Sequence, residues 1–141
     1  MDLKLAAQHG FAKFHRSLYQ LSRGRIGRRL GKTEHILLTT IGRKSGQPRT
    51  TPLTIVVDGA RTAIVASNGG APNHPAWYMN LLANPEVTVQ RGADKMAMRA
   101  RTADASERDA LWARAVATYQ GYEGYKAKTS REIPIVLLEK A

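Results

Sequence analysis

Three cations on one short turn give that turn the chemistry of an anion-binding site. The stretch GRKSGQPR joins two segments of strand-like composition and carries Arg43, Lys44 and Arg49 but no acidic residue. An arginine offers a planar fork of N–H donors to phosphate or carboxylate oxygens, and a lysine offers a mobile point charge. The backbone amides of Ser45 and Gly46 would add donors if the turn exposes them. The alternative is a solvated hairpin whose charges keep a sheet edge from aggregating.

A second group of candidates lies in ASNGGAPNHPAWYMN, where a strand end runs into two glycines and a short helix. Glycines at this point let the backbone approach a flat ring closely. On the helix, the indole of Trp77 can pack against a ring, and the amide of Asn80 can both donate and accept hydrogen bonds. Plain core packing is the alternative for Trp77. For His74 we expect helix capping or another structural role, not acid catalysis.

A row of tyrosines forms the third group. Tyr119, Tyr122 and Tyr125 recur every three residues, which places them along one side of a helical segment. A phenol can orient a substrate oxygen and supply a proton to it. Because a row of aromatic side chains is usually part of a core, the residues alone leave both interpretations open.

Motifs for other chemistries are incomplete. GRRLGKT at 27–33 is one residue short of a phosphate-binding loop and follows a helical pattern, not a strand. The four histidines lack the paired spacing of metal ligands, and no Gly-x-Ser-x-Gly elbow is present. The chain contains no cysteine, which excludes thiol chemistry and fits a reducing compartment. We therefore expect no metal centre, no nucleotide triphosphatase and no serine hydrolase.

The hydrophobic pattern predicts the elements that must position these groups. At 141 residues the chain is most economically one domain, 1–141, large enough for a core without disulfides. Apolar residues at intervals of three and four predict an amphipathic leading helix, followed by a basic, glycine-rich linker to residue 33. Further along we predict strands at 35–41, 49–57, 61–67, 86–91, 95–102 and 133–139, a short helix capped by Asn73 or His74, and a helix from the capping box of Asp104 and Glu107 to about 117. These elements describe an α+β domain around an antiparallel sheet or barrel.

The net charge of +11 is concentrated in the first third of the chain. Residues 1–49 hold eleven Lys and Arg against two acids, whereas residues 50–141 hold eleven against nine. Such a field favours anionic partners, among them phosphates, nucleic acid, acidic lipids and a polyanionic cofactor, without choosing between them. No run approaches the roughly 20 apolar residues of a membrane span, so we expect a cytoplasmic protein, soluble or peripheral to the membrane.

Three stretches, in their order and spacing, resemble a known family. GRKSGQPRTTP, ASNGGAPNHPAWYMNLLANPEV and YQGYEGYKAKTSREIPIVLLE are similar to the deazaflavin-dependent nitroreductases, also described as F420H2-dependent quinone reductases of the split β-barrel flavin-binding superfamily. The resemblance runs from about residue 36 to 139. It implies a split β-barrel of about six mainly antiparallel strands, with an N-terminal amphipathic helix and inserted helices. The implied cofactor is coenzyme F420, a deazaflavin with a phosphate and an oligoglutamate tail.

The resemblance also assigns roles to individual residues. The cationic turn becomes the clamp for the anionic tail, and the tyrosine row lies on the substrate side of the ring, with Tyr122 and Ser67 as the expected catalytic groups. Members of the family often have lysine where this chain has Asn68, so a cation near the cofactor is missing here. The expected cofactor contacts are Arg43, Lys44, Ser45, Gly46, Arg49, Ala66, Ser67, Asn68, Gly69, Pro75, Trp77 and Asn80, and the expected substrate contacts are Tyr119, Tyr122 and Tyr125.

The implied reaction is hydride transfer from reduced F420 to a quinone, a nitroaromatic compound or an activated enone. One alternative is the same barrel with FMN or another flavin. A second is a basic nucleic-acid-binding module, but no recognition helix is evident, so we do not expect nucleic acid as a partner. The basic first helix suggests contact with acidic membrane lipid, and its apolar face would otherwise pack on the barrel or on a second subunit of a homodimer.

Overall fold

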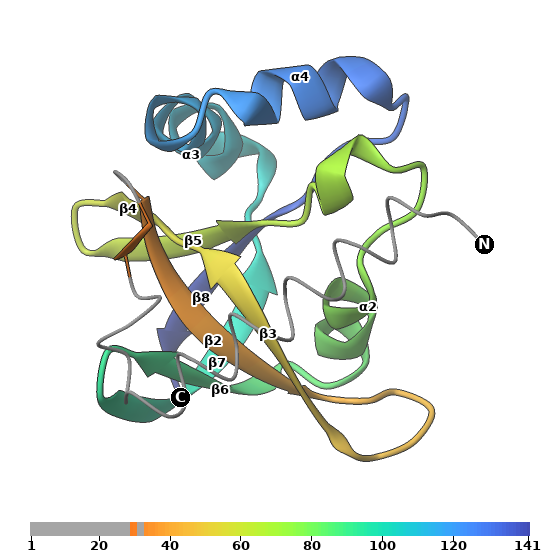
Figure 1. Ribbon diagram of the computed structural model, residues 1–141, viewed down its shortest axis with the longest axis vertical. Helices are drawn as coiled ribbons and strands as arrows, with labels where there is room; N and C mark the ends of the chain where they lie inside the picture. Colours follow the sequence, from red (N-terminus) through yellow and green to blue (C-terminus); the bar gives the residue numbers. More distant parts are fainter. Residues whose placement is uncertain (1–28, 31–32) are drawn as a thin grey trace.

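The computed structural model describes residues 29–30 and 33–141 and shows a curled, antiparallel sheet with helices packed on it (Figure 1). The sheet has eight strands in the order β1-β2-β6-β7-β8-β5-β4, with β3 paired to β2 outside this path. The strands are β1 (Arg29–Leu30), β2 (Thr33–Ile41), β3 (Pro48–Thr54), β4 (Val56–Asp58), β5 (Arg61–Val65), β6 (Glu86–Arg91), β7 (Asp94–Thr102) and β8 (Ile135–Lys140). The helices are the 3-10 turn η1 (Asn68–Gly70), α2 (Ala76–Ala83), α3 (Ala105–Thr118) and α4 (Gly121–Lys128). The predicted α+β class is confirmed.

The boundaries of the elements differ from the prediction at two places. The strand expected at 49–57 is two strands, β3 and β4, because the partner changes after Thr54: β3 pairs with β2, whereas Val56–Asp58 pair with β5. Within the expected linker, Arg29–Leu30 pair with β2 as β1. The expected first helix lies outside the described residues. In the described part of the chain, no helix is long and apolar enough to cross a membrane.

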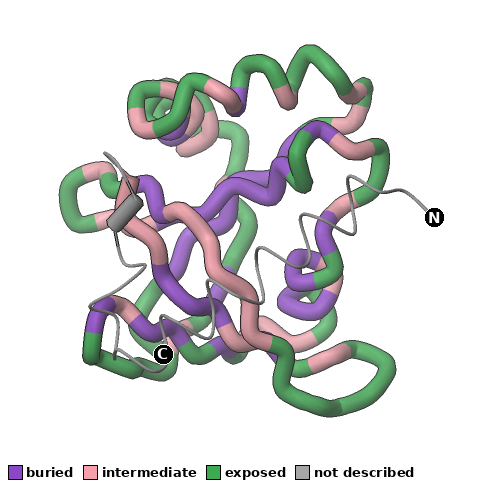
Figure 2. The backbone as a smooth tube through the Cα atoms, in the orientation of Figure 1, coloured by how far each residue is buried: buried purple, intermediate pink, exposed green. Residues whose placement is uncertain are grey.

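Two hydrophobic cores lie on opposite faces of β5 and β8. Successive strand residues point to opposite faces, so Ile64 and Val136 join the core closed by α2, and Val65 and Leu137 join the core covered by α3 and α4. In Figure 2, β5 and β8 are coloured mostly as buried where they run between the helices. Burial on both faces explains why the last strand reads as a continuous apolar run instead of alternating.

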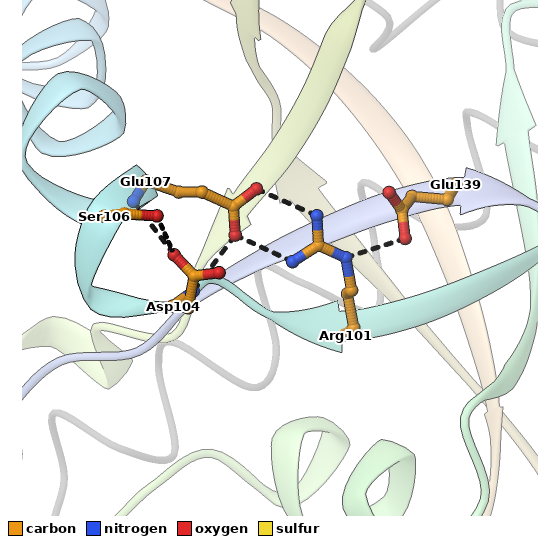
Figure 3. Close-up of polar contacts among 5 residues, drawn as sticks. All are labelled: Arg101, Asp104, Ser106, Glu107 and Glu139. Atoms are coloured by element: carbon orange, nitrogen blue, oxygen red, sulfur yellow. Dashed lines mark hydrogen bonds and ion pairs between the residues drawn. The ribbon is translucent and has the colours of Figure 1, made fainter.

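The start of α3 is anchored by a polar network that spans three elements (Figure 3). The predicted capping box is present: the side chain of Asp104 accepts from the N–H of Glu107, and the side chain of Glu107 accepts from the N–H of Asp104. Arg101 on β7 donates two hydrogen bonds to Glu107, at 2.7 and 2.8 Å, and a third to Glu139 on β8 at 2.8 Å. The hydrogen bonds from Arg101 hold the pKa of Glu107 at about 2.

Candidate functional site

The cationic turn joins β2 to β3 and is closed by its own backbone. The N–H of Gly42 donates to the carbonyl of Gln47 at 2.8 Å, and the N–H of Gly46 donates to the carbonyl of Gly42 at 2.8 Å. Gly46 has a φ of +71°, which glycine adopts without strain. Because its amide is engaged inside the turn, Gly46 does not offer the exposed donor that the sequence suggested. Its role here is to shape the turn.

Arg43 is held in place by a buried amide on α2. The side-chain oxygen of Asn80 accepts from the backbone N–H of Arg43 at 3.1 Å and from its guanidinium at 3.0 Å. The nitrogen of the same amide donates to the hydroxyl of Thr40 at 3.2 Å. Asn80 and Thr40 are buried, so these bonds fix the start of the turn against α2. In this structure Asn80 supports a cation, and direct cofactor contact by Asn80 stays a prediction.

Lys44 and Arg49 complete the positive charge of the turn. Both side chains are exposed. Arg49 lies near the hydroxyl of Ser45, to which it donates at 3.5 Å, and the same hydroxyl accepts from the N–H of Gln47 at 3.1 Å. Across residues 29–30 and 33–141, no carboxylate forms an ion pair with Arg43, Lys44 or Arg49. The charge of the turn is therefore available to an anion.

The loop that follows β5 has an unusual backbone. Asn68, Gly69 and Gly70 have φ angles of 49°, 64° and 82°, all in the left-handed region. Asn68 is exposed and tolerates this conformation better than most residues with a side chain, and its amide donates to the carbonyl of Asn73 at 3.0 Å. Ala66 and Ser67, which precede this run, are buried. Of the four cofactor contacts predicted in this loop, Ala66 and Ser67 are thus buried and Asn68 and Gly69 are exposed.

α2 begins directly after this loop. Its N-cap is Pro75, with no side-chain cap hydrogen bond, so the expected capping by Asn73 or His74 is wrong. A proline needs no partner for the N–H that it lacks, which makes it compatible with a helix start. Trp77 is 8% exposed and belongs to the first core, where its ring meets Tyr78 edge-on. The structure shows core packing for Trp77, and its contact with a cofactor stays a prediction.

Arg131 was not predicted as a site residue, and its side chain binds the loop after β5. Its guanidinium donates to the carbonyls of Ala66, Ser67 and Ala71 and to Nδ1 of His74, over 2.8–3.3 Å. His74 therefore has the structural role expected of it. Burial, and then the charge of Arg131, lower the pKa of His74. No local signal marks Arg131, because all four acceptors lie at least 57 positions earlier in the chain.

The three tyrosines form one aromatic cluster with two different environments. Tyr119 ends α3 and is 42% exposed, and its hydroxyl lies 3.1 Å from that of Tyr125 on α4. Tyr122 is only 6% exposed and packs in the second core. Burial raises the pKa of Tyr122, and the hydrogen bond to Tyr119 raises the pKa of Tyr125 to about 12. The phenols of Tyr122 and Tyr125 are thus hydrogen-bond donors at neutral pH. Tyr119 and Tyr125 are the more accessible of the three side chains.

The fold places the separate sequence motifs in succession along the molecule, from the β2–β3 turn through α2 and the loop after β5 to α4 (Figure 1). α2 lies between the β2–β3 turn and the loop after β5 (Figure 1), with Arg43 bonded to Asn80 on the helix. On the other side of the loop, η1 packs against α4. An added Cβ on Gly70 would lie 2.9 Å from the carbonyl oxygen of Tyr125, so the contact requires glycine. The turn is therefore linked to α2, and the loop that precedes α2 contacts the backbone of Tyr125 on α4.

Comparison with known proteins gives a consistent family. The family model described as F420H(2)-dependent quinone reductase matches residues 11–140. The F420H(2)-dependent quinone reductase Rv1261c of Mycobacterium tuberculosis is 39% identical over 132 residues, which cover 91% of this chain and 89% of the relative. The shorter Rv3178 of the same organism, a putative F420H(2)-dependent quinone reductase, is 37% identical over 73% of this chain and 87% of its own length.

Solved structures agree in fold and in sequence. A structure described as F420-H2 dependent reductase (FDR-A) is 43% identical, with a TM-score of 0.68 over 74% of this chain and 93% of that chain. A second structure, described as a domain-swapped dimer, is 39% identical, with a TM-score of 0.72 over 90% of this chain and 94% of that chain. The split β-barrel expected from the sequence is confirmed.

Proposed function

The chain belongs to the F420H(2)-dependent quinone reductase family, and on that premise we propose that it transfers a hydride from reduced coenzyme F420 to a quinone. The observation that carries the proposal is the link through α2. The cationic turn is bonded to Asn80 on this helix, and the loop after β5 leads into its first residue. An elongated cofactor with a flat ring and an anionic tail needs one site for each end.

The donor set of this region fits that cofactor. Phosphate and carboxylate oxygens are bound well by guanidinium and ammonium groups whose charge no internal carboxylate neutralises. Within the described residues, Arg43, Lys44 and Arg49 have no carboxylate partner, so they suit a phosphate and a glutamate tail. The loop with three left-handed residues, Asn68, Gly69 and Gly70, presents backbone instead of bulky side chains, which suits a flat ring.

Coenzyme F420 in its reduced form supplies the hydride when it is bound. The residues of this chain would hold the ring and the acceptor in near-attack geometry. We assign the hydroxyls of Tyr119 and Tyr125 to the acceptor oxygen, because both side chains are more exposed than Tyr122 and a phenol can donate a hydrogen bond to that oxygen. The hydroxyl of Ser67, at the base of the loop, is a second candidate for stabilising charge on that oxygen. Tyr122 stays a candidate proton donor, and its burial offers a second role, as the packed support of the other two rings.

The direct test uses the purified chain with F420. We expect saturable binding of F420, and oxidation of its reduced form when menadione is added, followed by loss of the reduced-state absorbance. A protein that binds no F420 at low salt, or that binds it but oxidises its reduced form with no quinone, would overturn the proposal.

FMN in the same barrel is the second candidate cofactor. The two differ in the tail, since FMN carries a single phosphate and no glutamate chain. If Arg43 and Lys44 hold the tail, affinity should fall when the glutamate chain is shortened or when salt is raised. If FMN binds as tightly as F420 or more tightly, at low and at high salt, the result would favour FMN as the cofactor.

Electron acceptors other than quinones could also react at this site. Nitroaromatic compounds and activated enones, like quinones, have an electrophilic atom bonded or conjugated to an oxygen that takes up the negative charge when a hydride is added. We therefore propose that both are reduced at the same site. Competition between menadione and a nitroaromatic compound for the reduced cofactor would support a shared site, and independent, additive rates would argue against it.

We also propose a single domain of residues 1–141 that forms a homodimer in the cytoplasm. The family match spans residues 11–140, and one similar structure is described as a domain-swapped dimer. Light scattering of the purified chain tests the dimer. Contact of the expected first helix with acidic lipid is a separate proposal that rests on sequence, because residues 1–28 lie outside the described residues. Flotation with anionic liposomes at low salt tests it, and no co-flotation would dispose of it.

A further inference from the structure

One guanidinium binds the loop after β5 at four points. Nε of Arg131 donates to the carbonyl of Ala71 at 3.0 Å, and one terminal nitrogen donates to the carbonyl of Ala66 at 3.3 Å and to Nδ1 of His74 at 3.0 Å. The other terminal nitrogen donates to the carbonyl of Ser67 at 2.8 Å. A guanidinium has five N–H donors, so Arg131 uses most of them on this loop.

Arg131 is not neutralised by an acid. None of the ion pairs in the described part of the chain includes it. Its acceptors are three carbonyls and a histidine nitrogen, which must be unprotonated to accept. A surface ion pair is therefore not what keeps arginine at this position. The geometry instead gives Arg131 a function toward the loop itself.

The bonds to Ala66 and Ser67 help to fix the direction of two peptide units of the loop; the carbonyl of Ser67 also accepts from the N–H of Gly70 at 2.9 Å. Both carbonyls are directed at Arg131, and Ser67 has helical backbone angles, φ −74° and ψ −33°. In a planar trans peptide, the N–H is directed opposite to the C=O of the same unit. The N–H groups of Ser67 and Asn68 therefore point away from Arg131. Among the described residues, neither donates to a backbone carbonyl.

We propose that Arg131 is a positioning residue of the cofactor site, which turns the N–H groups of Ser67 and Asn68 toward the bound deazaflavin ring. This inference rests on the proposed function. The arginine acts through the loop and does not itself contact the ring. Its planar fork engages three carbonyls at fixed spacing, which the single ammonium of a lysine cannot reproduce.

The first test compares two ligands, F420 and the deazaflavin riboside that lacks the phosphate and the glutamate tail. Arg131→Lys should raise the Kd of both ligands by a similar factor of about ten, because both present the same ring to the loop. Lys44→Ala should raise the Kd of F420 alone. Arg99→Lys serves as the control, since Arg99 pairs with Glu86 in an exposed ion pair on β6 and β7.

The second test leaves Arg131 intact. Ser67→Pro removes the N–H that Arg131 orients, and the φ of Ser67, −74°, is one that proline adopts. Ser67→Ala removes only the hydroxyl. We expect Ser67→Pro to weaken binding of the tail-less riboside about tenfold more than Ser67→Ala does, as for the loss of one good hydrogen bond.

The outcomes separate this inference from the proposed function. If the wild-type chain binds neither ligand, the proposed function fails. If it binds F420 while folded Arg131→Lys retains wild-type affinity for both ligands, only the positioning role is overturned. Should Arg131→Lys not fold, equal affinities of Ser67→Pro and Ser67→Ala for the riboside would overturn it.

Discussion

Asn80 and Arg43 lie 37 positions apart in the chain, yet one amide oxygen of Asn80 accepts both the backbone N–H and the guanidinium of Arg43. The second amide atom is bonded to Thr40, so a single buried side chain ties the β2–β3 turn to α2. A buried polar group with all its partners in place orients those partners rigidly. The position of the Arg43 charge is thus set by a helix, not by the turn that carries it.

This relationship predicts the effect of Asn80→Asp. The carboxylate can keep both bonds to Arg43 and can accept one from Thr40, but it neutralises the Arg43 charge. The Kd for F420 should rise about tenfold, because a charged hydrogen bond to the tail is worth roughly 1.5 kcal/mol or more. Titration of the fluorescence of F420 with each variant measures the change.

The matched control for this variant is Asn84→Asp at the C-cap of the same helix. It adds the same charge, and its side chain can still accept from the N–H of Glu86. Its Kd should stay near the wild-type value. Equal losses in the two variants would mean that net charge, not Arg43, controls binding.

Lys44→Ala tests the exposed cation of the turn. Lys44 makes no ion pair within the described residues, so its removal should leave the free energy of unfolding within about 0.5 kcal/mol of wild type. The Kd for F420 should rise about fivefold at low salt, since an exposed charge pair is worth up to about 1 kcal/mol. At high salt the difference should shrink, because screening weakens the wild-type contact.

Lys95→Ala on β7 is the control for Lys44→Ala, because it removes the same charge from an exposed strand residue. An unchanged Kd in both variants would return the turn to the alternative role of a solvated hairpin that protects a sheet edge.

Features that depend on neighbouring residues were predictable from the sequence. The capping box of α3 and the predicted strands that became β2, β5, β6, β7 and β8 all appear close to their expected positions. Each of these follows from a local pattern, such as the period of two in a strand or the spacing of a capping box. The positions of the cationic turn and of the aromatic row were predicted for the same reason.

Features that depend on contacts across the chain were not predictable. Arg131 reaches residues 57 to 65 positions earlier, and the sequence around it carries no sign of those acceptors. The break between β3 and β4 depends on a change of partner strand, from β2 to β5. The bonds from Asn80 to Arg43 and Thr40 join residues 37 and 40 positions apart in the chain. Pair contacts of this kind need the assembled fold.

Tyrosine substitutions separate the roles proposed for the aromatic cluster. Tyr119→Phe removes the hydroxyl that lies 3.1 Å from that of Tyr125. Since this hydrogen bond is the largest cause that raises the pKa of Tyr125 to about 12, that pKa should fall toward 10 in the variant. An absorbance titration of tyrosinate measures it. We also expect kcat/KM for menadione to fall about tenfold, with the Kd for F420 unchanged.

Tyr122→Phe is the companion variant. If Tyr122 only supports the other rings in the core, this variant should retain activity within about threefold, because a phenylalanine ring fills the same space. If Tyr122 donates the proton, kcat should fall by roughly a hundredfold or more. The first result would assign proton donation to Tyr119, Tyr125 or water, and the second would support the assignment made from the sequence.

Glu107 predicts an acid-sensitive step in stability. Its pKa is lowered from 4.5 to about 2, chiefly by hydrogen bonds from Arg101, so between these values the unfolded chain binds more protons than the folded one. The stabilising contribution is therefore present above about pH 4.5 and is lost as the pH falls toward 2. In Glu107→Gln, denaturant unfolding should show lower stability at pH 7 and a shallower loss on acidification.

The control for this variant is Glu86→Gln, which removes a carboxylate from an exposed ion pair with Arg99. It should keep the steep acid loss of the wild type. Parallel profiles for Glu107→Gln and the wild type would mean that the network with Arg101 does not contribute to stability in solution.

We expect alanine substitutions at Gly70 and Gly124 to change the stability of the protein in opposite directions. Alanine at Gly70 would need a φ of +82° and would bring its Cβ to 2.9 Å from the carbonyl oxygen of Tyr125, so Gly70→Ala should cost about 1–3 kcal/mol and weaken F420 binding. Gly124 lies within α4, where an added Cβ meets nothing within 4 Å. Gly124→Ala should stabilise by about 0.5–1 kcal/mol and leave F420 binding unchanged, because alanine loses less conformational freedom in a helix.

Urea unfolding of the two variants, with F420 titrations beside it, decides whether the loop rests on α4 in solution. A destabilised Gly70→Ala with weaker F420 binding would support a loop whose shape depends on that contact. If instead Gly70→Ala unfolds like the wild type and binds F420 normally, the loop tolerates a Cβ there. The close approach to Tyr125 would then not shape the cofactor site, and the tyrosines would owe their position to the second core alone.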